Sequence, residues 1–336
     1  MGAGEAGQRV DNFVIRRVPG VPKSHVYRLI RTGDVRVDGR RVRQTRRLAE
    51  GEQVRIPALR TRTRDTVRVP DALADELAAS VVLERDDFLV VAKPSGIAVH
   101  GGSGLAFGLL DALRQRLDAP GLELVHRLDR GTSGCLLIAR DNASNRRLQA
   151  LFRERAVEKG YVALVAGRWP EARRTVDVPL AKNVEHAGER RVVVAADGRQ
   201  ARSHFRIARR LPGATLVDVA IETGRTHQIR VHARHAGHAV VGDTRYGDNR
   251  TNARFRRLGL GRLFLHSARL AFDWCGERIV VEVPADAAWE RSLDALDAAR
   301  SDEAQRPAPP SPAERGSPGK NSTRRSPGTA RGRGSR

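Results

Sequence analysis

The apolar residues near the start of the chain recur three or four positions apart, as they do on one face of a helix. These positions are Val10, Phe13, Val14 and Val18. A second helix is predicted after them, with Ser24 as its N-cap and Gly33 as its end. The inward stripe of this helix consists of Val26, Leu29 and Ile30. The pattern therefore predicts two short helices at the start of a compact unit.

The pattern changes to strands after the second helix. VRVDGRRV predicts a hairpin that turns at Asp38-Gly39, because this dipeptide adopts the tight turns that join antiparallel strands. EGEQVRI predicts a closing strand. Residues 7–57 are therefore expected to form one small domain. Residues 58–79 show no clear period and are expected to be a linker.

From residue 80 to about residue 296, short apolar runs follow one another with few helices between them. VVLERDDFLVVAKP predicts two strands around an acidic turn, and CLLIAR predicts a buried strand. Further strands are predicted at YVALVAG, SHFRIARRL, ATLVDVAIET and RIVVEVP, and NASNRRLQALFRERA predicts a helix capped by Asn142. Strands without regular helical crossovers favour an α+β domain with a mixed, mainly antiparallel sheet.

Residues 301–336 are rich in Pro, Ser, Gly and Arg and contain almost no apolar residue. Such a segment buries too little surface to offset the entropy that is lost on ordering. We expect it to be disordered, with arginines that add weak affinity for RNA.

Charge is the strongest feature of the composition. The chain contains 61 basic and 39 acidic residues, a formal net charge of +22, and only five of the basic residues are lysine. This excess favours a polyanion partner, because neutralised phosphates supply most of the nonspecific affinity for nucleic acids. A GC-rich genome also enriches arginine, so composition alone leaves both explanations open.

The uneven placement of these charges favours a nucleic acid. Eight arginines crowd the second predicted helix and the hairpin: Arg28, Arg31, Arg36, Arg40, Arg41, Arg43, Arg46 and Arg47. A solvated basic face is the simpler interpretation, whereas a helix followed by a hairpin also suits a surface that follows phosphates. The candidate RNA contacts in this domain are Lys23, Arg28, Arg31, Arg40 and Arg41.

The cysteines and the apolar runs exclude other classes. Cys135 and Cys275 lie far apart and outside any paired motif, which argues against a disulfide framework and a cysteine-based metal site. No run approaches the ~18 apolar residues of a membrane span, and the first residues lack the apolar core of a signal peptide. We expect a soluble, cytoplasmic, monomeric protein without a membrane partner.

Asp129 stands between Arg127 and Arg130 in the stretch VHRLDRGTSG. An isolated sequence of this kind is most often a solvated ion pair that contributes less than ~1 kcal/mol. Here a turn and a buried strand follow it, which places Asp129 on a loop at the edge of a sheet, where functional groups concentrate. A carboxylate near arginines stays ionised, as a nucleophile must. The pattern leaves a salt bridge and a catalytic group both open.

Two further stretches carry candidate side chains. TGRTHQIRVHARHAGH contains four histidines, but it lacks both the H-E-x-x-H spacing and a cysteine partner for zinc. Arg225, Arg230 and His232, on a short predicted helix, fit contact with a polyanion or pairing with a carboxylate. Tyr161 opens an apolar strand, where a position in the core is the default.

Several stretches together resemble the motif set of the RluA-type family of pseudouridine synthases. They are VAKPSGIAVHGG, VHRLDRGTSG, EKGY and TGRTHQIRVHARHAGHAVVGD. GQRVDNF, GVPKSHVYRLIRTGDVRVDG and VHGGSGLAFG resemble the branch of this family that carries an N-terminal S4 domain and acts on the large ribosomal subunit. The resemblance spans roughly residues 6–290. It departs at Gly131 and Ala92, where relatives often have aspartate and asparagine.

The resemblance implies an S4-like RNA-binding domain at 7–57 and a catalytic domain with a central cleft at 80–296. It implies a bacterial enzyme that isomerises uridine to pseudouridine in 23S ribosomal RNA, with neither cofactor nor metal. Asp129 matches the catalytic aspartate, Tyr161 matches the tyrosine that packs against the target base, and Arg230 matches the partner of the aspartate. Arg127 matches an arginine that reaches into the RNA beside a nucleotide that has left its stack.

Two other functions remain open. A noncatalytic ribosomal RNA-binding or ribosome-assembly factor would use the same basic domain, but binding alone has no use for an aspartate and a tyrosine at these places. A related synthase that acts on transfer RNA would share the motifs. The S4-like domain favours 23S ribosomal RNA, or an assembly intermediate of the large subunit, as the partner.

Overall fold

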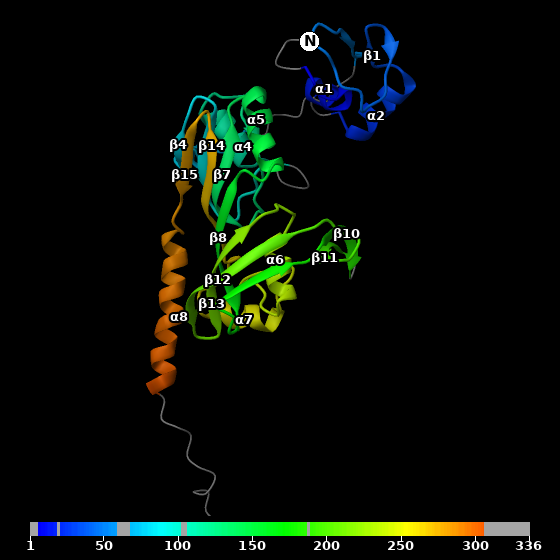
Figure 1. Ribbon diagram of the computed structural model, residues 1–336. Helices are drawn as coiled ribbons and strands as arrows, with labels where there is room; N and C mark the ends of the chain where they lie inside the picture. Colours follow the sequence, from blue (N-terminus) through cyan, green and yellow to red (C-terminus); the bar gives the residue numbers. More distant parts are fainter. Residues whose placement is uncertain (1–5, 19–20, 59–67, 102–105, 187–188, 306–336) are drawn as a thin grey trace, which may run out of the picture.

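The computed structural model of the protein describes residues 6–18, 21–58, 68–101, 106–186 and 189–305 (Figure 1). Residues 6–58, here called the N-terminal unit, contain two helices and three short strands. They are α1 (Val10–Arg17), α2 (Lys23–Thr32), β1 (Arg36–Val37), β2 (Arg40–Arg41) and β3 (Val54–Arg55). The three strands form an antiparallel sheet in the order β2-β1-β3. Buried residues of both helices and of β1 share one core, including Val14, Ile30 and Val37.

The turns of the N-terminal unit follow local sequence chemistry. Asp38 and Gly39 have φ angles of 46° and 75°, as a two-residue hairpin requires, so the predicted hairpin is confirmed. Gly33 ends α2 in the left-handed conformation, also as predicted. The predicted N-cap is wrong, because α2 begins at Lys23 with Pro22 before it. Ser24 lies inside the first turn.

The rest of the described chain is organised around one ten-stranded sheet. Its strands are β4 (Val81–Glu84), β5 (Phe88–Lys93), β6 (Glu123–Leu124), β7 (Ser133–Ala139), β8 (Glu158–Ala166), β9 (Arg173–Asp177), β12 (Arg202–Leu211), β13 (Ala214–Ile221), β14 (Leu265–Trp274) and β15 (Glu277–Glu282). The main path runs β4-β5-β7-β14-β8-β13-β12-β9, and only β7 and β14 pair in parallel. The predicted mixed, mainly antiparallel α+β fold is confirmed. A separate hairpin, β10 (Leu180–His186) with β11 (Glu189–Val194), projects from the sheet (Figure 1).

Helices lie on both sides of this sheet. They are α3 (Asp71–Ala78), α4 (Leu109–Arg116), α5 (Asn142–Arg153), α6 (Gln228–His235), α7 (Asn249–Arg257) and α8 (Ala287–Gln305). The N-cap of α5 is Asp141, whose carboxylate accepts the Ser144 N–H, so the predicted cap at Asn142 is wrong by one residue.

Two segments expected to lack regular structure contain helices. Helix α3 lies within the predicted linker 58–79, and its residues Ala74 and Leu77 are completely buried in the main core. Their burial stabilises a helix that the sequence pattern did not reveal. Helix α8 continues to Gln305, inside the segment 301–336 that was expected to be disordered. Residues 306–336 lie outside the described residues.

The junction of β7, β14 and β8 positions the candidate site. Every residue of β7 is buried, as predicted for this strand. At Gly134, where φ is +103°, a Cβ atom would lie 2.1 Å from the Ser267 carbonyl oxygen of β14. Only glycine permits this approach of the two strands. The second glycine of GTSG therefore fixes where β7 meets β14, and with it the loop that carries Asp129.

Candidate active site

A pocket of about 270 Å³ opens where the loop before β7 faces β8 and the start of α6. Its lining includes five of the predicted site residues, namely Arg127, Asp129, Tyr161, Arg225 and Arg230. Some of these residues are more than a hundred positions apart in the sequence, so the fold alone brings them together. The clustering agrees with the functional interpretation of VHRLDRGTSG rather than with a solvated surface ion pair.

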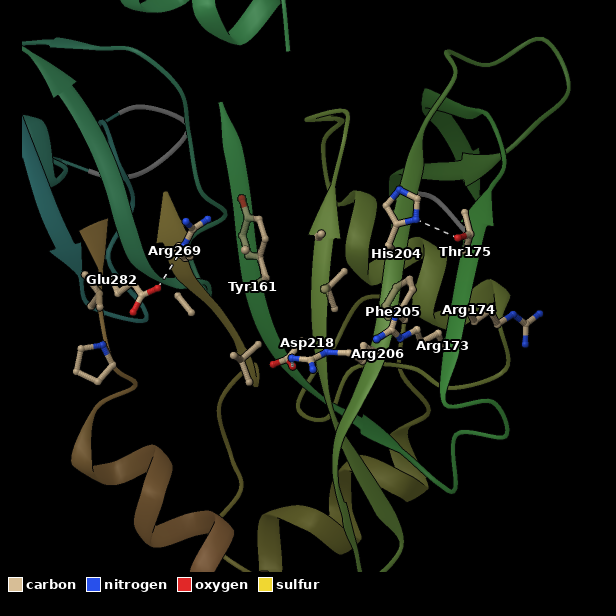
Figure 2. A pocket seen from close by; sticks show the side chains of 17 residues that line it. Tyr161, Arg173, Arg174, Thr175, His204, Phe205, Arg206, Asp218, Arg269 and Glu282 are labelled. Atoms are coloured by element: carbon tan, nitrogen blue, oxygen red, sulfur yellow. Dashed lines mark hydrogen bonds and ion pairs between the residues drawn. The ribbon is translucent and has the colours of Figure 1, made fainter. Parts of the chain in front are cut away.

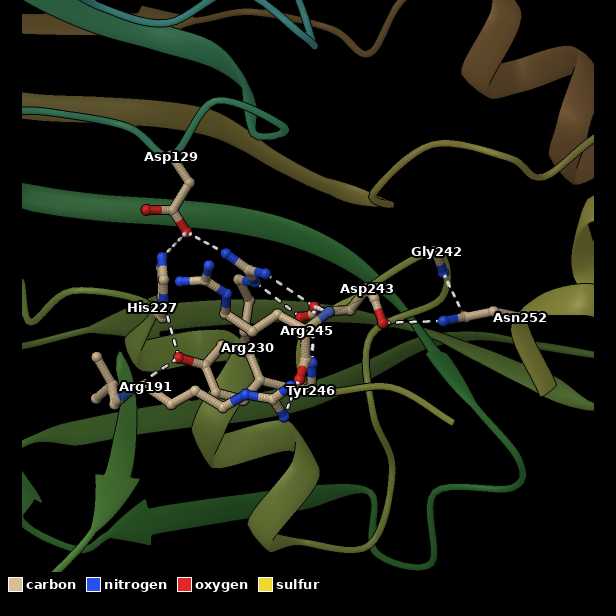
Figure 3. A network of polar contacts seen from close by, with 10 residues as sticks. Asp129, Arg191, His227, Arg230, Gly242, Asp243, Arg245, Tyr246 and Asn252 are labelled. Atoms are coloured by element: carbon tan, nitrogen blue, oxygen red, sulfur yellow. Dashed lines mark hydrogen bonds and ion pairs between the residues drawn. The ribbon is translucent and has the colours of Figure 1, made fainter. Parts of the chain in front are cut away.

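The Asp129 carboxylate is held by one arginine nitrogen. Nη1 of Arg230 donates to Oδ2 of Asp129 at 2.9 Å, across 101 positions of sequence (Figure 3). The Asp129 side chain is 19% exposed and that of Arg230 is 10% exposed. No described residue donates a hydrogen bond to the other oxygen, Oδ1. Asp129 therefore lies at the pocket wall with one oxygen bound and one oxygen available to a ligand.

Arg230 is itself held from behind by a second carboxylate. Its Nε and Nη2 donate to the two oxygens of Asp243 at 2.7 and 2.8 Å, and the Asp243 side chain is completely buried. Asp243 also accepts the backbone N–H groups of Arg245 and Tyr246. This two-point contact fixes the plane of the guanidinium, so that Nη1 is directed at Asp129.

The charges of this network reinforce one another. Burial alone would raise the pKa of Asp243, but the hydrogen bonds and the charge of Arg230 lower this pKa below its ordinary value. Burial likewise opposes the charge of Arg230, and the two carboxylates raise its pKa nonetheless. Both groups are ionised at neutral pH, which provides a fixed positive charge beside Asp129.

His227 lies on the other side of Asp129. Its Nε2 is 3.7 Å from Oδ2 of Asp129, and its Nδ1 is 2.7 Å from the Tyr246 hydroxyl. The residue has a φ of 54°, a backbone conformation that is strained for a side chain of this size. Burial lowers the pKa of His227, and Asp129 only partly offsets this. A neutral imidazole therefore stands next to the carboxylate.

Tyr161 lies in the middle of β8 and is only 8% exposed, yet its ring contributes to the pocket wall. Figure 2 shows the ring standing on its strand with the hydroxyl directed away from the backbone. Burial raises the pKa of Tyr161 to about 12. The phenol is therefore protonated at neutral pH, suited to packing and to donating a hydrogen bond.

The Asp129 loop is tied to β5 by Lys93, which is 1% exposed. Its ammonium donates to the carbonyl oxygens of Pro94, Ile97 and Arg130 at 2.8, 2.7 and 3.2 Å. Burial lowers the pKa of Lys93 to about 7. Three carbonyl acceptors match the three protons of the ammonium, so this lysine holds the backbone next to Asp129 in place.

The other residues that were predicted to contact RNA lie in different parts of the protein. Arg127 is exposed at the mouth of the pocket. Arg225 precedes α6 rather than lying on it, and its Nε donates to the Gln200 carbonyl. The predicted contacts of the N-terminal unit are all exposed on α2 and β2: Lys23, Arg28, Arg31, Arg40 and Arg41.

His232 is not placed for RNA contact, and this prediction is wrong. The residue is 0% exposed, with Nδ1 3.0 Å from the Ser203 hydroxyl and Nε2 3.3 Å from the Val178 carbonyl. Burial lowers the pKa of His232 to about 4. Its neutral ring joins α6 to the sheet.

Sequence reasoning missed His227, Asp243 and Lys93. His227 was considered only as a metal ligand, and among the described residues no group of three His, Cys, Asp or Glu side chains could hold a metal ion. Asp243 directly follows an apolar run in HAVVGD, a sign of burial that could have marked it as the partner of a buried cation. Lys93 stood at the end of a predicted strand and was given no role.

Comparison with known proteins identifies relatives along most of the chain. The model of the RNA pseudouridylate synthase family matches residues 87–235. "Ribosomal large subunit pseudouridine synthase C" of Yersinia pestis is 46% identical over 88% of this chain and 93% of its own length. The protein of the same name from Escherichia coli strain K12 is 46% identical over 89% and 96%.

Solved structures show the same fold in the catalytic part. Human RNA Pseudouridylate Synthase Domain Containing 4 matches with a TM-score of 0.57 and 25% identity, over 67% of this chain and 96% of its own. Human RNA Pseudouridylate Synthase Domain Containing 1 matches with a TM-score of 0.53 and 29% identity, over 69% and 96%. Among the described helices, none is long and apolar enough to cross a bilayer. The chain belongs to the RluA-type family of pseudouridine synthases, and is therefore an isomerase homologous to ribosomal large subunit pseudouridine synthase C.

Proposed function

We propose that this enzyme converts specific uridines of 23S ribosomal RNA to pseudouridine, with Asp129 as the nucleophile. The observation that carries the proposal is the Asp129 carboxylate, held by Arg230 at the wall of a pocket that Tyr161 also lines. A carboxylate with a bound and a free oxygen is suited to attack, because the bound oxygen fixes its orientation while the free oxygen faces the ligand.

The reaction rearranges atoms without adding or removing any. The bond between uracil N1 and the sugar C1′ breaks, a bond between C5 and C1′ forms, C5 loses a proton and N1 gains one. A covalent bond between Asp129 and the nucleotide allows the uracil to detach, rotate and be recaptured. Arg230 orients Asp129 through Oδ2, and Oδ1 is the oxygen left to form this bond.

Tyr161 and the pocket size support a flipped nucleotide as the reactant. The target atoms are hidden while the base is stacked in RNA, so the nucleotide must leave the stack. A pocket of about 270 Å³ suits one nucleotide rather than a helix. The Tyr161 ring offers a flat apolar surface to the base, and Arg127 at the mouth is exposed and able to contact the RNA that remains outside.

The ribosomal substrate rests on the relatives and on the N-terminal unit. The relatives are large-subunit synthases by name, and their similarity covers 88–89% of this chain, more than the catalytic part alone. The exposed basic residues of α2 and β2 provide a phosphate-binding surface apart from the pocket. We propose that the partner is 23S RNA, free or in an assembling large subunit, and that the enzyme acts as a cytoplasmic monomer.

The catalytic assignment is tested with Asp129→Asn. The amide keeps the size and can still accept from Arg230, so the fold and RNA affinity should be retained. The rate of pseudouridine formation should fall by at least ~10³-fold, because a nucleophile is lost. The matched control is Asp86→Asn, an exposed aspartate in the turn between β4 and β5. An Asp129→Asn enzyme that keeps more than a tenth of the rate contradicts the assignment.

The substrate is tested by mapping pseudouridine in total RNA from a strain without the gene. Sites in 23S RNA should disappear and return with the wild-type gene but not with the Asp129→Asn gene. Loss of sites in transfer RNA alone contradicts the ribosomal substrate. Return of the sites with the Asp129→Asn gene would identify the protein as a noncatalytic factor that supports another synthase.

A further inference from the structure

We propose that a pocket beside α7, distinct from the catalytic pocket, binds phosphates of the RNA substrate. It measures about 820 Å³ and is lined by three arginines of α7, namely Arg250, Arg254 and Arg257. Its other walls are the end of β8 at Ala166 and Gly167, the turn at Gly213 between β12 and β13, and Gly237 and His238 after α6. No residue lines both this pocket and the catalytic one.

The three arginines share one face of α7, because they are spaced by four and three positions. Like charges at such spacing destabilise an isolated helix by a few tenths of a kcal/mol per pair. Among the described residues, none of the three has a carboxylate within the distance of an ion pair. An external anion can neutralise them, and arginine is suited to phosphate because its planar fork binds two oxygens at once.

The larger pocket of the sheet offers a contrast to this lack of partners. That pocket measures about 970 Å³ and is also lined by arginines (Figure 2). However, Arg206 pairs there with Asp218 at 2.6 Å, and Arg269 pairs with Glu158 and Glu282 at 2.8 and 3.2 Å. Its positive charges are largely compensated within the protein, whereas those of the α7 pocket are not.

The walls of the α7 pocket keep the cations in place. Gly213 has a φ of +66°, and a Cβ atom there would lie 3.1 Å from both terminal nitrogens of Arg254. The guanidinium therefore lies close against this turn, and a side chain at position 213 would push it aside. His238 is fixed by its Nδ1, 2.9 Å from the Ala166 carbonyl, and its ring lies against Trp169. Its Nε2 is left as a further polar group at the pocket.

The side chains favour phosphates over bases. Phe255, the phenylalanine in the lining, is 1% exposed, and the His238 ring already lies against Trp169, so the three guanidinium groups dominate the open surface of the pocket. Contacts between arginines and phosphates contribute affinity for RNA but do not distinguish one base sequence from another. This proposal rests on the proposed function, because the polyanion is the RNA that the enzyme modifies. With this pocket, the surface that contacts RNA would extend to the end of β8 that is farther from the N-terminal unit (Figure 1).

The distance along β8 predicts which RNA can reach the pocket. Ala166 lies five residues beyond Tyr161 on the strand, a rise of about 17 Å. This rise is a minimum, because residues five positions apart face opposite sides of the sheet, so the RNA must extend several nucleotides beyond the flipped one to reach the arginines. A long substrate should use this pocket, and a hairpin with two nucleotides on either side of the target should not.

The test compares two RNAs with one triple variant, Arg250→Ala/Arg254→Ala/Arg257→Ala. The long probe is a 23S RNA fragment around a mapped target uridine, and the short probe is the minimal hairpin. The Kd and KM for the long probe should rise roughly 10–100-fold with kcat unchanged, while the Kd for the short probe stays within threefold. The slope of log K against log salt for the long probe should decrease in magnitude by about 2–3.

The matched control is Arg85→Ala/Arg116→Ala/Arg278→Ala, which removes the same charge from exposed arginines that pair with Glu277, Asp75 and Glu158. It should change the Kd for the long probe by less than about threefold. Arg254→Lys, which retains the charge, should recover part of the affinity lost in Arg254→Ala. Thermal unfolding of all variants shows whether the fold is intact.

Three outcomes overturn the proposal. The first is an unchanged Kd of the triple variant for the long probe, and the second is an equal loss of affinity for both probes in a folded variant. The third is unchanged RNA binding together with lost retention on large-subunit particles, which would identify an acidic protein as the partner. If the proposed function itself is wrong, the wild-type enzyme forms no pseudouridine in the long probe. This result distinguishes failure of the proposed function from failure of the phosphate pocket.

Discussion

Arginines serve two different purposes in neighbouring helices of this protein. In α6, Arg230 is buried and joins two carboxylates, so each of its three nitrogens has an assigned acceptor. In α7, the arginines of the proposed phosphate pocket are exposed and have no carboxylate partner among the described residues. A buried arginine contributes through geometry, because an unpaired charge in the interior is costly. An exposed arginine contributes through charge, which solvent and salt screen.

The two helices are also physically joined. Nδ2 of Asn252, on α7, donates to the Asp243 carbonyl at 2.9 Å, and its Oδ1 accepts the Gly242 N–H at 3.0 Å. Figure 3 shows this side chain beside the turn that carries Asp243. Asn252 is the third buried polar residue behind Asp129, after Arg230 and Asp243. One connected part of the fold therefore contains a buried, paired arginine and a set of exposed arginines without carboxylate partners among the described residues. Substitution should affect the two kinds differently.

The largest effect is expected from Arg230→Lys. A single ammonium cannot span Asp129 and Asp243 in the way the planar fork does, so one carboxylate loses its partner. Loss of a buried partner costs about 3–5 kcal/mol, and an equal rise in the activation free energy corresponds to a fall in kcat of roughly 10²–10⁴-fold. The control is Arg234→Lys, exposed on the same helix. Single-turnover kinetics measures both, and a kcat within threefold of wild type for Arg230→Lys would show that charge alone suffices.

A smaller loss is expected from Asp243→Asn. Arg230 keeps its contact with Asp129 but loses the charge that fixes its fork, so kcat should fall roughly 10–100-fold with little change in KM. Unfolding in urea should show a loss of stability of about 1–3 kcal/mol. Asp248→Asn is the control, because its carboxylate caps α7 and asparagine caps equally well. If Asp243→Asn and Asp248→Asn have the same kinetics, Asp243 does not position Arg230 for catalysis.

Buried polar groups in α6 also predict a dependence of stability on pH. The pKa of His232 is about 4 in the folded protein and about 6.5 in the unfolded chain. The unfolded state therefore binds more protons between these values, so the contribution of His232 is complete above pH 6.5 and decreases as pH falls to about 4. Over this pH range His232 should lower the free energy of unfolding by about 3 kcal/mol. His232→Gln should be less sensitive than wild type to pH in this window, as measured by urea unfolding.

Its control is His235→Gln, on the exposed side of the same helix, which should unfold with the pH dependence of wild type. If His232→Gln retains the full loss of stability between pH 6.5 and 4, another group is responsible for it.

The smallest effect is expected from a single exposed arginine. Arg254→Ala should weaken binding of a long 23S RNA fragment by only a few-fold at physiological salt, and should reduce the salt slope by about one. Arg256→Ala removes the same charge from the same helix but lies outside the pocket lining. Fluorescence anisotropy over a range of salt concentrations separates them. Indistinguishable slopes would mean that α7 attracts RNA only through its net charge.

Several elements could be predicted from the sequence because their causes are local. Helical spacing of apolar residues revealed α1 and α2, and Gly33 marked the end of α2 because its left-handed conformation favours glycine. Asp38-Gly39 predicted its hairpin through the same backbone preference. The run after GTSG predicted β7, and so placed Asp129 on the loop before a buried strand. The roles of Asp129 and Arg230 came from motif resemblance, since spacing alone left them open.

The remainder depended on which surfaces meet in three dimensions. Helix α6 reads as polar in QIRVHARH, yet Gln228, Arg230 and His232 are buried because Ser203, Asp243 and the Val178 carbonyl satisfy them from elsewhere in the chain. A buried polar side chain is stable only where such partners exist, and a sequence does not show which partners will lie opposite. The sequence by itself determined the turn at Asp38-Gly39, the end of α2 at Gly33 and strands such as β7, β8 and β13, and its motif resemblance identified the candidate nucleophile. Only the tertiary structure decided that His232 belongs to the interior and that Asp243 orients Arg230, because both depend on contacts between distant segments.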